Sequence, residues 1–507
     1  MGIVRINQHQ NFLYYTDLEP DDVVSIMIFV YRISQQAKQS ITPIKLAFLV
    51  GEGDSAIKIA RMQKLINEYK EIGLLQNTEI SLIQGYSDYS GAQKEFLADG
   101  EDLLSTKEIN EAKQIFPNGS DPKTKQQARS NINQFLTTNP NTLVISLKPM
   151  RELQDIANEN NMVFNQHVLA CTGSYNFRSI CSGTESEEAL QKKLVMLLNS
   201  FSRSYIYETY STTETNSTSS LNATEFFNLV TRADKNTLLG KLKIFIDNWK
   251  NYLLENDRKV GLLEVLKKLN TAINEENQQA FKHALNGDFT ENAWKLLRPI
   301  IDEGQKKYVD NKELLSAFQK LGRLLGKWKN ITQAPMQIVN ADPGLLAVLT
   351  GDCDAHLCIQ PVEIAFQGQF TILKLPEENK TESCRTFVYL PGAKTTLTNY
   401  LQLREQEKEQ KTKPKELQIS QEDLLNDINR VITTTGIEIN ALTMSHQQKL
   451  QRSTISSSSQ TNPQQVAKIA TAIRMAGGSP IHLQQPANQS QDSTSLLTPT
   501  QNIISRP

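Results

Sequence analysis

Short apolar runs alternate with longer amphipathic segments between residues 11 and 183. Five runs have the length and composition of buried strands, namely Asn11–Thr16, Ile44–Val50, Ile80–Gln84, Leu143–Leu147 and His167–Cys171. Apolar residues recur at helical spacing between them, as in Pro20–Gln36 and Ser55–Ile72. Strands and helices alternating at this rhythm predict an α/β fold, with a mostly parallel sheet and helices on both of its faces.

The pattern changes at about residue 184. Helical periodicity then dominates up to residue 335, in Glu187–Ser200, Glu225–Glu255, Val260–Ala272, Ala293–Glu303 and Leu314–Lys329. Strand signals return in Val362–Phe366, Gln369–Leu375 and Arg385–Leu390. We therefore predict that residues 1–183 and 336–404 are two parts of one α/β core, separated by an α-helical insertion or subdomain at residues 184–335.

The last hundred or so residues are polar. A charge run at Glu405–Lys415 precedes one amphipathic segment, Ser420–Ile432. Two further stretches, Gln451–Pro463 and Gly477–Pro507, are rich in Ser, Thr, Gln, Asn and Pro, a composition typical of disorder. Residues 405–507 are predicted to be a largely disordered extension with one isolated helix.

Overall charge and hydropathy narrow the classes of partner. The net charge of -1 gives no general attraction to nucleic acid or to an anionic membrane. Met1–Gln10 lacks an apolar signal core, and no apolar run is long enough to span a bilayer. The sequence predicts a soluble protein that binds neither nucleic acid nor membrane, and it leaves the oligomeric state open.

Cysteine usage indicates a reducing compartment. The chain has 5 cysteines at irregular spacing, which argues against a disulfide framework. Gly351–Cys358 brings two cysteines, two aspartates and His356 together. Zinc binding is one interpretation of this segment, but the spacing is not that of a standard finger, so a buried or loop cluster is the default.

The most informative segment follows the first predicted strand. Asp17 leaves the strand, and Asp21 and Asp22 open the next helix, whose N-terminus offsets part of their charge. Together with Glu19, these carboxylates repel one another unless a cation lies among them. Calcium suits such a group because it accepts roughly six to eight oxygen ligands from flexible loops. A plainer interpretation stays open, in which Asp21 and Asp22 cap the helix and Asp17 is solvated.

Polar clusters follow each predicted strand. They are Asp17–Asp22, Gly51–Asp54, Gly85–Ser90, Lys148–Glu152 and Thr172–Arg178. In open α/β sheets, ligands bind at the carboxyl ends of the strands. These clusters therefore predict a binding site at that edge of the sheet.

The acidic segment resembles the N-terminal signature of the inosine-uridine-preferring nucleoside hydrolases, D-x-D-x-x-x-D-D. Asp17, Asp21 and Asp22 match its last three aspartates, Tyr15 stands at the first, and Glu19 replaces a glycine. Further segments resemble the family in the same order. The G-N turn corresponds to Gly51-Glu52, and the G-A end of the third strand corresponds to Ile83-Gln-Gly85. The loop T-G-P-L-T-N corresponds to Ile145–Leu153, the M-G-G site to Cys171–Gly173, and the E-F-N site to Ser174–Asn176. The H-D-P-L-A-V-A segment corresponds to Asn340–Leu349, and the V-E-V-E-x-x-G hairpin corresponds to Val362–Phe370.

The resemblance covers residues 11–400 apart from the helical region, and it implies a calcium-dependent hydrolase that cleaves the N-glycosidic bond of a nucleoside or a related ribosyl compound. The implied calcium ligands are Asp17, Asp22, the main-chain carbonyl of Leu147, and Asp342. Asp17 would also be the general base that activates a calcium-bound water. The implied substrate-binding residues are Asp21, Glu52, Ser174 and Asn176.

Departures from the family pattern keep other functions open. Ala341 stands where many members carry the histidine that protonates the leaving base, and Ser174 replaces a ribose-binding glutamate. His167 or His356 could substitute for that histidine only if the fold brings one of them close. The alternatives are a catalytically degenerate binding module or effector that acts through the helical insertion, and a phosphatase with a D-x-D nucleophile, whose threonine and lysine motifs are missing.

The expected compartment follows from these features together. A soluble, cysteine-poor chain without a signal peptide is expected in the cytoplasm. A polar, Gln- and Asn-rich tail on an enzyme-like domain is also compatible with a bacterial protein that a specialised secretion system exports.

Overall fold

The structure of the chain is a computed structural model. It describes residues 4–87, 104–148, 150–173, 187–208, 220–221, 224–256, 265, 268–269, 272, 274–277, 279, 291–333, 338–339, 341–367, 370–376, 384–410 and 414–458. Residues Met1–His446 form one compact unit, and Gln447–Pro507 form a second. Within the described residues, no helix combines the length and the apolar character needed to cross a bilayer.

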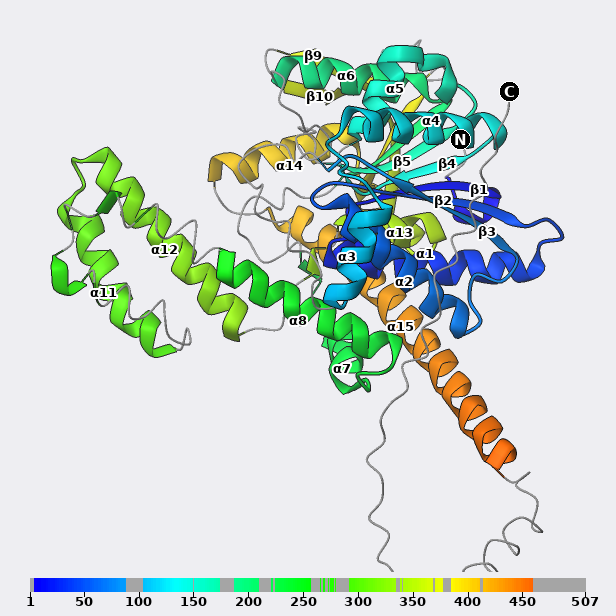
Figure 1. The fold of residues 1–507 in the computed structure, drawn as a ribbon. Helices are drawn as coiled ribbons and strands as arrows, with labels where there is room; N and C mark the ends of the chain where they lie inside the picture. Colours follow the sequence, from blue (N-terminus) through cyan, green and yellow to red (C-terminus); the bar gives the residue numbers. More distant parts are fainter. Residues whose placement is uncertain are drawn as a thin grey trace, which may run out of the picture. The chain divides into compact units, whose positions relative to one another are not determined.

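A mostly parallel sheet organises the first unit (Figure 1). Its nine strands lie in the order β10-β9-β11-β6-β5-β4-β1-β2-β3. They are β1 (Asn11–Thr16), β2 (Ile44–Val50), β3 (Thr78–Gln84), β4 (Leu143–Ser146), β5 (Val168–Gly173), β6 (Arg203–Glu208), β9 (Leu357–Gln367), β10 (Phe370–Lys374) and β11 (Thr386–Pro391). Strand β9 is antiparallel to both of its neighbours, and the other pairings are parallel. The predicted α/β fold with a mostly parallel sheet is confirmed.

The connections and the rest of the chain are mostly helical. The α-helices are α1 (Pro20–Gln39), α2 (Ser55–Glu71), α3 (Thr106–Ile115), α4 (Pro122–Thr138), α5 (Arg151–Asn160), α6 (Glu187–Ser200), α7 (Thr224–Arg232), α8 (Leu238–Asn256), α11 (Glu291–Lys307), α12 (Lys312–Gln333), α13 (Ala341–Thr350), α14 (Leu397–Gln410) and α15 (Lys415–Ser458). Short 3₁₀ turns span Ile6–Gln8, Asn161–Phe164 and Asp354–His356, and β7 (Ser220–Leu221) pairs with β8 (Ile338–Val339) outside the main sheet.

Strand β1 has a hydrophobic core on each of its faces. Phe12 and Tyr14 belong to one core, which α1, α8, α13 and α15 also line, whereas Leu13 and Tyr15 belong to the other, which α4, α5 and α6 line. All four side chains are fully buried. Burial on both faces explains why the strand reads as a continuous apolar run. Figure 1 shows the two groups of helices on opposite sides of the strands.

The strand order reverses at β1. After β1 the chain adds β2 and β3 on one side, then crosses to add β4, β5 and β6 on the other. The direction of winding therefore reverses between β1 and β4. In parallel α/β sheets, the carboxyl ends of the strands at such a reversal form the usual ligand crevice. This edge carries the residues just after Thr16 and Ser146.

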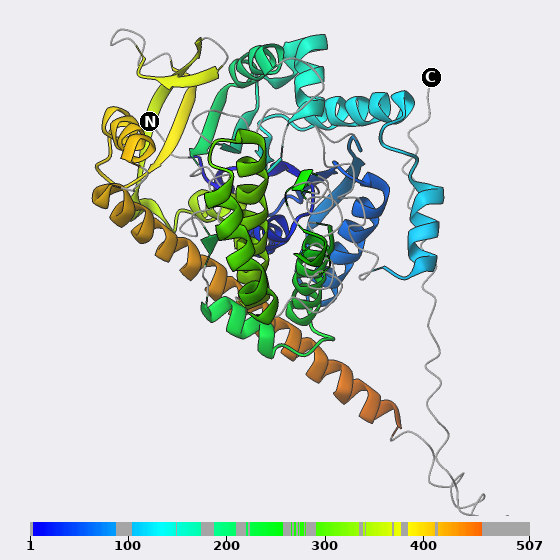
Figure 2. The same cartoon turned by 90° about the vertical axis from the view of Figure 1, so that its left-hand side faces the viewer.

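One strand lies inside the region predicted to be helical. Arg203–Glu208 forms β6, between β5 and β11, so the α/β core continues to at least residue 208 and not only to 183. Its alternating pattern is too short to stand out from the helices around it, and the strand is recognisable only from its partners. The region also holds α6, α7, α8, α11 and α12. The single helix predicted over Glu225–Glu255 is divided into α7 and α8, and most of the predicted helix Val260–Ala272 lies outside the described residues. Figures 1 and 2 show α11 and α12 side by side.

The C-terminal extension is more ordered than predicted. Helix α15 runs over 44 residues, well beyond Ser420–Ile432 on both sides, and includes Gln451–Ser458. Leu424, Ile428, Val431, Ile432 and Ile439 are buried in the core that contains α1 and α13. Tertiary burial of this apolar stripe stabilises a helix whose polar remainder resembles a disordered segment. Residues 459–507, including Gly477–Pro507, lie outside the described residues.

Candidate functional site

The loop from β1 to α1 has a constrained geometry. Leu18 adopts a left-handed backbone conformation, with φ of 59°, which is uncommon for a residue with a side chain. The Leu18 amide donates a hydrogen bond to Thr16 Oγ1 at 2.9 Å. Pro20 then begins α1 at its first helical position, where proline needs no amide hydrogen. The turn places Asp21 and Asp22 in the first turn of α1.

Two hydrogen bonds hold the Asp22 carboxylate. Thr16 Oγ1 donates to Asp22 Oδ1 at 2.6 Å, and the Glu19 amide donates to Asp22 Oδ2 at 3.2 Å. Asp22 is 1% exposed. The donors are the last residue of β1 and a residue of the β1–α1 loop, so the local sequence fixes the direction of this carboxylate.

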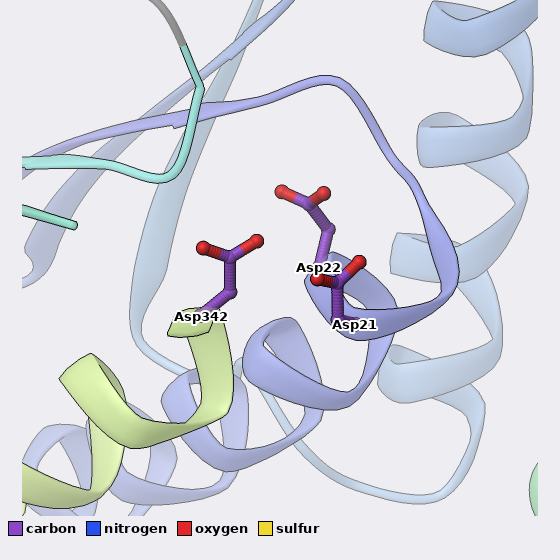
Figure 3. Close-up of side chains that lie close together, drawn as sticks. All are labelled: Asp21, Asp22 and Asp342. Atoms are coloured by element: carbon purple, nitrogen blue, oxygen red, sulfur yellow. The ribbon is translucent and has the colours of Figure 1, made fainter. Parts of the chain in front are cut away.

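Asp342 meets the two aspartates from a distant part of the chain. It lies in the first turn of α13 and interacts with the Thr172 side chain at the end of β5. Carboxylate oxygens of Asp21, Asp22 and Asp342 lie within 4.8 Å of one another, and Figure 3 shows them projecting into a shared space. Asp17 lies beside this group and interacts with the Asp22 side chain. We call Asp17, Asp21, Asp22 and Asp342 the acidic centre.

Burial and repulsion from neighbouring carboxylates disfavour the charged forms of Asp21, Asp22 and Asp342. Burial, with repulsion from Asp17, raises the pKa of Asp21 to about 7. Burial and neighbouring carboxylates raise the pKa of Asp22 and Asp342 well above the ordinary aspartate value. Among the described residues, no ion pair joins Asp17, Asp21, Asp22 or Asp342 to a Lys, Arg or His side chain. Such a group needs protons or a cation to be stable.

The donor set of the acidic centre fits a hard divalent cation. Carboxylate oxygens are the ligands that calcium prefers. The nearby Tyr14 hydroxyl is fully buried and has no hydrogen-bond partner among the described residues. Within the described ranges, Asp21, Asp22 and Asp342 are the one set of three or more His, Cys, Asp or Glu residues close enough to hold a metal. The zinc interpretation of Gly351–Cys358 therefore lacks support, and Cys353 is buried in an apolar core.

A second set of buried charges lies at the carboxyl ends of β2, β3 and β4. The Lys148 side chain is 1% exposed, and its Nζ lies 3.9 Å from Glu152 Oε1 and 4.5 Å from the centre of the Tyr15 ring. Burial lowers the pKa of Lys148 to about 8, against the attraction of Glu52 and Asp17. Burial raises the pKa of Glu152 to about 8. The sequence placed Lys148 and Glu152 in a polar cluster after a strand and gave neither of them a role.

Two glycines make room for these charges. A Cβ atom at Gly51 would lie 2.7 Å from Lys148 Nζ, and one at Gly85 would lie 2.6 Å from Glu152 Oε1. Glu52, next to Gly51, is 5% exposed and has a positive φ of 61°. Its amide donates to the Tyr86 carbonyl at 2.6 Å. The Gly-Glu turn after β2 is thus shaped by the buried charges that it contacts.

Of the other predicted site residues, Leu147 lies near the acidic segment, and two lie outside the described residues. Leu147 directly follows β4, and its amide donates to the Tyr15 carbonyl of β1 at 3.0 Å, so it lies at the reversal point of the sheet. Ser174 and Asn176 lie outside the described residues. Ala341, which precedes Asp342, has no acid–base group.

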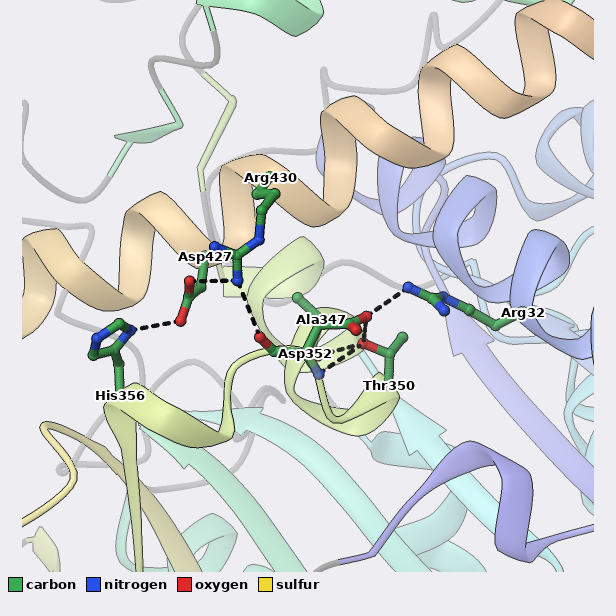
Figure 4. A network of polar contacts seen from close by, with 7 residues as sticks. All are labelled: Arg32, Ala347, Thr350, Asp352, His356, Asp427 and Arg430. Atoms are coloured by element: carbon green, nitrogen blue, oxygen red, sulfur yellow. Dashed lines mark hydrogen bonds and ion pairs between the residues drawn. The ribbon is translucent and has the colours of Figure 1, made fainter.

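Neither candidate histidine lies with the acidic centre. His167 precedes β5, at the amino end of the strand, and its Nδ1 accepts a hydrogen bond from the Thr142 amide at 3.2 Å. His356 Nδ1 lies 2.6 Å from Asp427 Oδ2 on α15. Asp427 also pairs with Arg430, which reaches the Asp352 carbonyl, and Asp352 pairs with Arg32 of α1 (Figure 4). These contacts give both histidines structural roles.

Comparison with solved structures finds similarity to nucleoside hydrolases. An inosine-uridine-preferring nucleoside hydrolase from Bacillus anthracis is 10% identical, with a TM-score of 0.38, over 84% of this chain and 100% of that chain. A plant nucleoside hydrolase is 10% identical, with a TM-score of 0.38, over 83% and 98% of the two chains. No protein-family model and no curated protein matches. Likeness at this level carries no inference about activity, which has to come from the geometry of the acidic centre.

Proposed function

We propose that the chain is a calcium-dependent hydrolase that cleaves the N-glycosidic bond of a nucleoside or a related ribosyl compound. One observation carries the proposal. Aspartates from the β1–α1 loop and from α13, far apart in sequence, present carboxylate oxygens within 4.8 Å of one another at the reversal point of a parallel sheet.

The residues of the acidic centre would bind the ion, and Asp17 would also act as the general base. Asp22, Asp342, Asp17 and the Leu147 carbonyl would hold the ion, with Asp21 close enough to contribute or to accept a hydrogen bond from a ribose hydroxyl. When bound, calcium would supply Lewis-acid activation of a water and orientation of vicinal hydroxyls. Asp17 would accept the proton of the attacking water. The surrounding carboxylates favour the positive charge that develops on the sugar in an oxocarbenium-like transition state.

The lack of a histidine near the leaving group, in the part of the chain that the structure describes, limits the substrates that the protein could cleave. Ala341 cannot donate a proton, and His167 and His356 are engaged elsewhere in the fold. Among the described residues of the acidic centre, there is thus no histidine to protonate a departing base. We infer a preference for ribosyl compounds whose leaving group departs without protonation, since these need less help from a general acid.

The test is turnover. Purified protein with calcium is incubated with purine and pyrimidine nucleosides and with nicotinamide-ribosyl compounds, and free base and reducing sugar are measured. We expect release of base that falls at least about a hundredfold in Asp17→Ala, as general-base contributions of this size predict. Turnover that survives Asp17→Ala unchanged would contradict the assigned base.

A second function is favoured by Ala341. A binding module that keeps the calcium site without chemistry, and acts through its helical region, would also tolerate alanine at this position. Calcium binding without release of base from any of these compounds would favour the module. Absence of both calcium binding and base release would count against the hydrolase and against the binding module.

A further inference from the structure

Lys148 is a buried, positively charged residue beside the acidic centre. It follows β4, the strand next to β1 at the reversal point of the sheet. Its side chain is 1% exposed. A Cβ atom at Gly51 would lie 2.7 Å from the Lys148 ammonium, and the centre of the Tyr15 ring lies 4.5 Å from it. Packing therefore restricts where this ammonium group can lie.

The charges around Lys148 oppose one another. Glu52 and Asp17 attract the ammonium, and Glu152 Oε1 lies 3.9 Å from it, whereas Lys58 and Arg151 repel it. Glu52 interacts with the same cations and with Asp17. Asp17 therefore interacts both with Asp22 in the acidic centre and with Lys148. The calcium ligands and the proton transfer proposed above make no use of Lys148.

We propose that Lys148 is a positioning residue that sets the cation affinity of the acidic centre, with Glu52 as its counter-charge. The inference rests on the proposed function only in that the centre takes up a divalent cation. Charges act over longer range away from bulk water, because the effective dielectric constant is lower there. The ammonium opposes an incoming cation and competes with it for Asp17, and Glu52 offsets part of this effect.

Opposite effects of two substitutions test the idea. Lys148→Met removes the charge but keeps an apolar stem against Tyr15, and it is expected to tighten calcium binding about tenfold. Glu52→Gln leaves the ammonium without its counter-charge and is expected to weaken binding about tenfold. The double variant is expected to lie within about threefold of wild type. A purely structural role for the pair would weaken binding in all three.

Calcium affinity of the full chain is measured by titration calorimetry at pH 7, with no substrate present. Lys45→Met serves as the control, since Lys45 is a partly exposed lysine of β2 that pairs with Glu79. Circular dichroism and thermal unfolding check the fold, and Lys148→Gln replaces Lys148→Met if the latter fails to fold.

Each outcome separates this inference from the proposed hydrolysis. Tighter binding in the Lys148 variant, or calcium uptake by that variant alone, supports the inference even if no substrate is turned over. Equal or weaker binding in that variant overturns it, as does the lack of calcium binding in wild type and variant alike. Whether the protein cleaves a nucleoside or a related ribosyl compound is tested by the separate turnover assay.

Discussion

Asp22 and Lys148 are both almost completely buried, yet they are held in different ways. Asp22 receives hydrogen bonds from Thr16 and from the Glu19 amide, within six residues of chain. Lys148 depends on Glu152, on the Tyr15 ring and on space left by Gly51. A buried charge needs partners at short range. The first arrangement is local in sequence, whereas the second requires several strands to be in place.

His167 makes a prediction about stability and pH. Burial lowers its pKa to about 4, from an ordinary 6.5, and Nδ1 accepts a hydrogen bond that requires the unprotonated nitrogen. Below about pH 6.5 the unfolded state binds a proton that the folded state does not. The free energy of unfolding should therefore fall as pH drops from 6.5 toward 4.

The measurement is urea denaturation at pH 7 and pH 5. His167→Gln cannot titrate, so its loss of stability between the two pH values should be smaller than that of wild type. An equal loss in both proteins would show that His167 does not govern this range. The comparison uses the change with pH, because the substitution also alters stability at pH 7.

Among the helices, α15 shows most clearly how tertiary contacts decide order. Its apolar stripe is buried in the core with α1 and α13, and Asp427 and Arg430 connect it to the α13–β9 turn. Ile428 is fully buried, whereas Ile437 on the same helix is 51% exposed. The two isoleucines therefore offer a matched pair for measuring how much α15 contributes to the fold.

We expect Ile428→Ala to lower the free energy of unfolding by about 2–5 kcal/mol, the range for a large-to-small change in a core. The same substitution at Ile437 should change it by no more than about 0.5 kcal/mol. Urea denaturation followed by circular dichroism measures both. Similar losses in the two variants would mean that α15 is not docked through this stripe.

At the scale of the whole molecule, the proposed ion would connect the β1–α1 loop to α13. A ligand that binds only the folded state stabilises it, by about 2.7 kcal/mol at a concentration of a hundred times Kd. We therefore expect calcium to raise the melting temperature and a chelator to reverse the increase. Asp342→Asn should abolish the increase, because it removes the ligand charge from α13.

Asp352→Asn is the control for that experiment. Asp352 lies just beyond the other end of α13 and pairs with Arg32, away from the acidic centre. Its variant should keep the calcium-dependent increase in melting temperature. An increase that persists in Asp342→Asn would argue that calcium binds elsewhere.

Features that depend on neighbours along the chain could be predicted from the sequence. Hydrophobic periodicity located β1, α1, β2 and α2, because burial on a strand or helix repeats at the period of that element. The acidic run after β1 could be found because its residues lie close together in the sequence. The parallel sheet was predicted from the alternation of strands and helices. These conclusions needed no knowledge of which strands pair.

Features that depend on strand pairing and side-chain packing required the assembled fold. The fold had four such consequences. It brought Asp342 within reach of Asp22, enclosed Lys148 among Glu52, Glu152 and Tyr15, and added β6 to the sheet. It also placed His167 at the amino end of β5, away from the carboxyl edge where the acidic centre lies. Local patterns cannot show these outcomes, because each depends on chain segments that meet only when the sheet is assembled.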